Sequence, residues 1–76
     1  MHFGEWMRHR LTKHGKSMAW MSHEIGASQS LLTRWRKGSH PRTEYFIKVC
    51  IVISKLEHKP LGIIVAEAAK TLGINI

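Results

Sequence analysis

Apolar residues recur at helical spacing along most of this chain. Near the N-terminus three of them stand four residues apart with basic residues between, which predicts an amphipathic helix from about Phe3 to His14. Gly15 offers a stop for that helix, because glycine adopts left-handed backbone angles without strain. Ser17 is then placed to cap a second helix with its hydroxyl oxygen.

The stretch from Ser17 to Gly38, SMAWMSHEIGASQSLLTRWRKG, divides into two short helices around a glycine. The second helix should end near Ile25, because Gly26 permits the positive φ of a tight turn and Ser28 can cap the helix that follows. Gly38 closes this third helix. Apolar residues at helical spacing occur on both sides of the turn: Met18, Met21 and Ile25 before it, and Leu31, Leu32 and Trp35 after it.

Two longer helices are predicted in the second half of the chain. After the break at Pro41, Thr43 can cap a fourth helix that carries Glu44 in its first turn. Pro60 is acceptable in the first turn of a fifth helix, which ends before Gly73. The apolar faces comprise Phe46, Val49, Cys50 and Ile53 in one helix and Leu61, Ile64, Val65, Ala68 and Leu72 in the other. The fold class is therefore all-α, as one compact bundle of about five helices over residues 1–76.

Length and composition disfavour catalysis, metal binding and a membrane span. A chain of 76 residues has a marginal core, which a deep substrate pocket would consume. The lone Cys50 cannot form an internal disulfide, and the six histidines lack the spacing of a closed metal site. The longest apolar run is far too short to cross a bilayer. We therefore expect a cytoplasmic protein that is not an enzyme and that needs no cofactor or metal.

The net charge of +7 is concentrated in one part of the chain. The segment from Arg8 to Arg42 holds eight basic residues and one acid, Glu24, whereas the charges of the remaining residues cancel. A field of this kind attracts a polyanion such as nucleic acid. An acidic membrane surface is a further candidate, against which the capped and glycine-punctuated pattern argues.

The segment from Ser17 to Gly38 resembles the helix-turn-helix of the Cro and phage-repressor family, also called the XRE family, and the likeness extends over roughly Phe3 to Ile53. The family pattern is a capped helix, a glycine turn, a Ser- or Thr-capped recognition helix, Arg-Trp and a closing glycine. It reads here as Ser17, Ile25-Gly26-Ala27-Ser28, Arg34-Trp35 and Gly38, with Pro41 at a common proline position. The departures are Met18, where many members have Gln, Ser22, where most have Ala, and Trp20, where a polar residue is usual.

This resemblance implies a lambda-repressor-like fold and a sequence-specific DNA-binding transcriptional regulator. The protein would be a Cro-like repressor of phage or prophage type, acting in the bacterial cytosol or nucleoid, or in a phage-infected cell. Gln pairs bidentately with adenine and Arg with guanine, so the base-reading candidates are Gln29, Ser30, Thr33 and Arg34. Candidates for contacts to the DNA backbone are Lys16, Ser17, Ser28, Arg36, Lys37, His40 and Arg42. Arg8, Arg10 and Lys13 are weaker candidates for such contacts.

Such regulators bind inverted-repeat operators as homodimers, which requires a dimer surface. Apolar residues beyond the predicted core faces mark the C-terminal helix, about residues 60–72, together with the tail and part of the fourth helix. The dimer candidates are Ile51, Val52, Ile63, Ala66 and Ile74, with Ile76 beyond them. The alternative function is a protein-interaction module, such as an antitoxin or anti-repressor, which would bind a protein partner through Trp20 or the apolar C-terminus.

Overall fold

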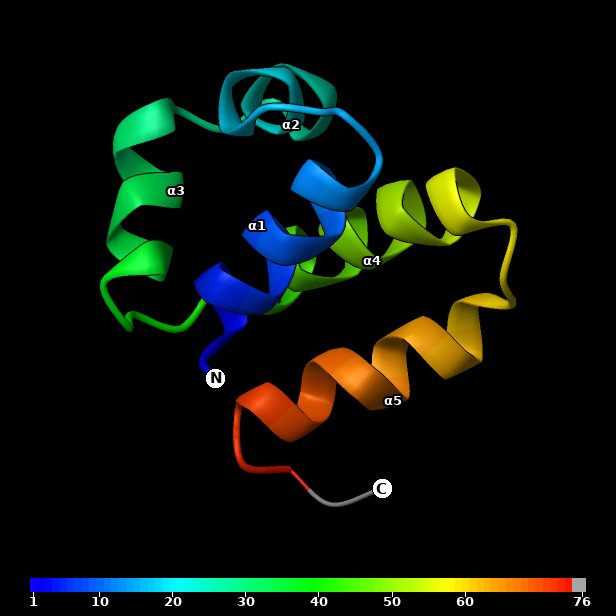
Figure 1. Ribbon diagram of the computed structural model, residues 1–76. Coiled ribbons are helices and arrows are strands. Elements are labelled where there is room, and N and C mark those ends of the chain that lie inside the picture. Colours follow the sequence, from blue (N-terminus) through cyan, green and yellow to red (C-terminus); the bar gives the residue numbers. More distant parts are fainter. Residues whose placement is uncertain (75–76) are drawn as a thin grey trace.

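The computed structural model describes residues 1–74, and these form five helices (Figure 1). They are α1 (Phe3–Lys13), α2 (Met18–Ile25), α3 (Gln29–Arg36), α4 (Thr43–Glu57) and α5 (Leu61–Thr71). The prediction of an all-α bundle is confirmed. Ile51, Val52 and Ile53, a run of β-branched residues in α4, are helical. The candidate Ile76 lies outside the described residues. No helix within residues 1–74 is both long and apolar enough to cross a membrane.

Helix α1 is the central element, because it contacts each of the other four helices. In Figure 1, α3 stands at the left and α2 at the top, whereas α5 crosses the lower right of the molecule. The radius of gyration is 11.1 Å. A compact chain of this length is expected to have a radius of about 11 Å. The helices therefore enclose one core, and α3 and α5 lie on opposite sides of it.

The ends of α2 and α3 follow the capping chemistry that the sequence predicts. The Ser17 hydroxyl accepts a hydrogen bond from the backbone N–H of Trp20 at 3.0 Å, and the Ser28 hydroxyl accepts one from Leu31 at 3.2 Å. Gly26 ends α2 in the left-handed region with a φ of 68°. These local bonds satisfy backbone groups that helix ends leave open. They set where α3 starts relative to α2.

The prediction that Thr43 caps α4 was wrong. Thr43 is the first residue of the helix, and Arg42 occupies the capping position without a side-chain cap bond. Arg42 has extended backbone angles there, as expected of the residue that precedes a helix. Glu44 does lie in the first turn, where its negative charge suits the helix dipole.

The core contains most of the predicted apolar faces, with corrections at some positions. Leu61, which the pattern placed on the apolar face of α5, is 39% exposed, whereas Ala69 is buried beside Ile64 and Ala68. Half-buried residues that pack against the core are Met18, Leu31, Val65 and Leu72. The buried apolar residues are Phe3, Trp6, Met7, Leu11, Met21, Ile25, Leu32, Trp35, Phe46, Val49, Cys50, Ile53, Ile64, Ala68 and Ala69. All five helices therefore contribute to one continuous apolar cluster.

Two helices approach each other closely at Gly4 in the first turn of α1. A methyl group added to Gly4 would overlap the backbone of Trp35 and Arg36, so α1 rests directly on the last turn of α3. The Phe3 ring meets the Trp35 ring edge-on, with 5.8 Å between their centroids. This contact fixes the inclination of α3 against the core. The sequence pattern of α1 did not reveal it.

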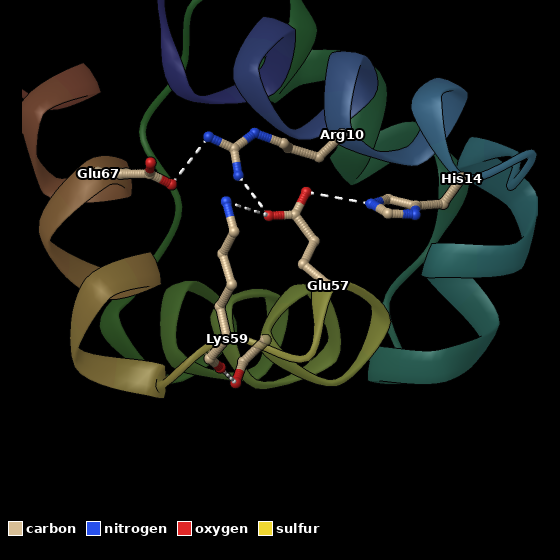
Figure 2. Close-up of polar contacts among 6 residues, drawn as sticks. Arg10, His14, Glu57, Lys59 and Glu67 are labelled. Atoms are coloured by element: carbon tan, nitrogen blue, oxygen red, sulfur yellow. Dashed lines mark hydrogen bonds and ion pairs between the residues drawn. The ribbon is translucent and has the colours of Figure 1, made fainter.

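A charged network joins α1 to α4 and α5 (Figure 2). The Arg10 guanidinium donates to Glu57 at 2.6 Å and to Glu67 at 2.8 Å, and His14 Nε2 lies 3.2 Å from the other Glu57 oxygen. The Lys59 ammonium is 3.7 Å from Glu57, whose side chain is only 2% exposed. Burial raises the pKa of Glu57, but the hydrogen bond from His14 and the charges of Arg10 and Lys59 outweigh it and lower that pKa overall.

Candidate nucleic-acid interface

The four predicted base-reading residues lie together on the outward face of α3. Gln29, Ser30, Thr33 and Arg34 are all exposed, whereas Leu32 and Trp35 on the inward face are each 1% exposed. Residues three or four apart are neighbours on a helix surface, so these four side chains form one continuous polar patch. The buried pair anchors the helix and leaves this patch free toward solvent.

The hydrogen bonds of this patch determine which groups remain available. The Thr33 hydroxyl donates to the backbone carbonyl of Gln29 at 2.9 Å, so its proton is used within the helix and its oxygen can still accept. The side chains of Gln29, Ser30 and Arg34 form no hydrogen bond or ion pair with any residue from 1 to 74. Their amide, hydroxyl and guanidinium groups are therefore free for a partner.

A basic hollow of about 400 Å³ adjoins the end of this patch. It brings Arg34 together with His40 and Arg42, two residues that the sequence predicts as backbone contacts. The remaining lining consists of Leu31, Trp35, Ser39 and Tyr45. Two guanidinium groups beside an imidazole make this hollow suitable for an anionic group such as a phosphate.

The other predicted backbone contacts occupy exposed positions at helix ends. Lys16 and Ser17 precede α2, Ser28 precedes α3, and Arg36 and Lys37 follow at its C-terminal end. The two serine hydroxyls accept cap bonds, which leaves their O–H groups able to donate to a phosphate. The Lys16 ammonium lies 4.9 Å from the centroid of the Trp20 ring.

Two of the basic residues in the charged segment are already paired within the protein. Arg8 forms an ion pair with Glu5 at 3.2 Å, and Arg10 is held by the two carboxylates of α4 and α5. The hydrogen bond from Arg8 lowers the pKa of Glu5. The positive charge that remains near α3 therefore comes from a smaller set of residues than the sequence total indicates: Arg34, Arg36, Lys37 and Arg42.

Two departures from the family pattern also have structural explanations. Met18 is half-buried and packs against the core. It therefore contributes to packing at a position where a glutamine would contact the DNA backbone. Ser22 is 7% exposed, and its hydroxyl donates to the carbonyl of Ala19 at 2.8 Å. The small side chain of Ser22 thus fits on the buried face of α2, and its hydroxyl has a hydrogen-bond partner.

The predicted dimer residues divide between two surfaces. Ile63 and Ile74 are each 51% exposed, and Ile74 borders an apolar hollow of about 240 Å³ near the C-terminal end of α5. Ala66 is half-buried in α5. In contrast, Ile51 and Val52 line a different hollow, together with Trp20 of α2.

Comparison of this chain with protein-family models, curated proteins and solved structures finds no match. Within residues 1–74, no three His, Cys or Glu side chains come together in a way that could hold a metal ion. The free polar face of α3 and the basic hollow beside it are the features of this surface that can bind a partner.

Proposed function

We propose that this protein is a sequence-specific DNA-binding transcriptional regulator of the Cro and phage-repressor type, with α2, the Gly26 turn and α3 as its helix-turn-helix. The observation that carries this proposal is the exposure of four adjacent polar side chains on α3, with Leu32 and Trp35 buried directly behind them. Buried anchors hold a reading helix rigidly, and free donors on its outer face can meet base edges.

The dimensions and chemistry of α3 support this role. An α-helix with its side chains is about 10–12 Å in diameter, which fits a major groove about 12 Å wide, and the eight residues of α3 extend about 12 Å along it. Gln29 would pair with adenine through its amide, and Arg34 would pair bidentately with guanine. Lys37 and Arg42 would meet phosphates on either side of the groove and set the register of the helix.

A unit of this size reads only a few base pairs, so we propose that two copies bind an inverted-repeat operator about one helical turn apart. Exposed Ile63 on α5 and Ile74 in the segment after it are suited to this association, because exposed apolar side chains favour contact with a second copy. Ile51 and Val52 line the separate hollow beside Trp20. A bound dimer would repress by occluding a promoter.

Binding-site selection from random duplexes, followed by fluorescence anisotropy, tests this function. We expect selection to yield an inverted repeat. Arg34→Ala should weaken binding to that site by about 10-fold or more and relax the preference at one base pair, because a bidentate pair contributes about 1–3 kcal/mol of discrimination.

Two further variants control this experiment. Lys37→Ala should weaken all sequences alike and make the salt slope about one unit shallower, because it removes one phosphate contact. Lys70→Ala removes the same charge from α5 and should leave the slope unchanged. Selection without a consensus, or equal losses from Arg34→Ala on every sequence, would refute the proposed base reading.

A further inference from the structure

A second hollow lies between α2 and α4, away from the polar face of α3. Its volume is about 440 Å³, and its apolar lining comes from Trp20 and Ile25 of α2 and from Ile51, Val52 and Leu56 of α4. Exposed Lys48 and Lys55 line it along α4, and Glu24 is its single acid. None of these residues belongs to the proposed base-reading or backbone set.

Trp20 is the prominent side chain of this hollow. It is half-buried and packs against the edge of the core. Its ring lines the hollow, and the Lys16 ammonium lies 4.9 Å from the ring centroid. A tryptophan that is partly exposed in a concave apolar site is typical of the residues that dominate binding energy at protein interfaces.

We propose that the hollow between α2 and α4 binds an acidic amphipathic helix of a partner protein. The lining along α4 extends from Lys48 to Leu56, which corresponds to about 12 Å of helix. A partner helix of two to three turns would match this length and would insert apolar side chains spaced as i, i+4 and i+7. Two lysines of the lining, Lys48 and Lys55, together with Lys16 at the Trp20 ring, stand against one glutamate and select carboxylates on the flanks of that helix.

Charge and shape favour this occupant over two others. A second copy of this chain carries the same net charge of +7, and its most apolar helix, α5, contains one acid and one lysine, so it lacks the required acidic flanks. An anionic membrane also attracts lysines, but insertion into a bilayer needs apolar side chains on a protruding face. Here they line a hollow, which suits the convex surface of a helix.

The test uses a panel of fluorescein-labelled peptides of about 14 residues, long enough for three helical turns. Each peptide carries Leu, Phe or Trp at positions i, i+4 and i+7 and Glu at the other positions. Matched sets replace every Glu by Lys or scramble the order. We expect saturable binding of acidic members by the full chain, with at least about 10-fold weaker binding of both matched sets.

Variants then locate the site. Lys48→Glu/Lys55→Glu should weaken the acidic peptides by about 10-fold or more, whereas Lys37→Glu/Lys70→Glu, with the same change of net charge, should weaken them much less. Trp20→Ala should also cause a loss of about 10-fold or more. Because Trp20 contacts the core, circular dichroism must show that this variant is folded; the lysine pair is exposed and provides the independent test.

Three results would overturn the proposal: no acidic peptide binds saturably, the two double variants lose affinity equally, or anionic phosphatidylglycerol vesicles bind through Lys48 and Lys55 while the peptides do not. Arg34→Ala should leave peptide binding unchanged. Failure of DNA reading is therefore distinguishable from failure of this site.

Discussion

Replacement of Gly4 by alanine should destabilise this protein far more than a single methyl group ordinarily would. The new Cβ would overlap backbone atoms of Trp35 and Arg36, which belong to a helix and cannot rotate aside as a flexible side chain could. Relief therefore requires α1 to move away from α3. That movement would loosen the contact between the Phe3 and Trp35 rings, whose centroids are 5.8 Å apart.

The expected loss follows from opposing contributions. Overpacking of a well-filled contact destabilises by about 1–3 kcal/mol, and weakening an aromatic pair adds about 0.5–1.5 kcal/mol. The higher helix propensity of alanine returns about 0.8–1 kcal/mol. These contributions give a net loss of about 0.5–4 kcal/mol, with a central value of about 2 kcal/mol, a large part of the roughly 4–11 kcal/mol expected for a domain of this size. At the central value, the melting temperature should fall by about 8–16 °C.

Urea unfolding followed by circular dichroism measures this difference in the free energy of unfolding. Gly62→Ala is the matched control, because Gly62 is likewise the second residue of its helix and a Cβ there meets open space. That variant should be neutral or more stable by up to about 1 kcal/mol. If Gly4→Ala were within about 0.5 kcal/mol of the parent protein, or as stable as Gly62→Ala, the proposed contact of α1 with the α3 backbone would be refuted.

Three further outcomes follow from the buried groups. Glu57→Gln should lower the free energy of unfolding by about 2 kcal/mol, as measured by urea titration. The loss is smaller than that of a fully buried ion pair, because Arg10 keeps its contact with Glu67 and its side chain is 20% exposed. An unchanged urea midpoint would contradict this expectation. The pKa of Glu57 in the folded protein lies below the ordinary 4.5, so the stabilisation by its carboxylate is complete above that pH and is lost as the pH falls through the folded pKa. Glu57→Gln should therefore reduce the loss of stability in acid. Parallel plots of unfolding free energy against pH for the two proteins would refute this. Burial raises the pKa of Cys50 to about 11, so a thiol reagent at neutral pH should react only on unfolding, and rapid labelling of the native protein would be inconsistent with its burial.

The sequence predicts local features of this fold well because their causes are local. Helical spacing identifies all five helices, and the hydroxyl groups of Ser17 and Ser28 cap the helices that they were expected to cap. Gly26 adopts the positive φ that its place between two short helices requires. The exposed polar patch on α3 follows from the same periodicity, because burial of Leu32 and Trp35 determines the opposite face.

Features that depend on distant parts of the chain could not be obtained in this way. Gly4 looks like a weak point in a helix until the backbone of α3 is placed against it. Arg10 meets Glu57 and Glu67 only because α4 and α5 fold back onto α1. Ile51 and Trp20 line one hollow only because α4 folds against α2, which the spacing of apolar residues along the chain does not show.

The pairing of charges changes the meaning of the net charge of +7. With Arg8 and Arg10 held by carboxylates, the exposed cations fall mainly into two groups, one around the end of α3 and one along the hollow between α2 and α4. Lys16, which precedes the cap of α2 and lies over the Trp20 ring, belongs to both proposed binding sets. A DNA phosphate and an acidic helix would both draw on this one ammonium group. If both proposals hold, the two ligands oppose each other there, and thermodynamic linkage requires the same penalty in each direction.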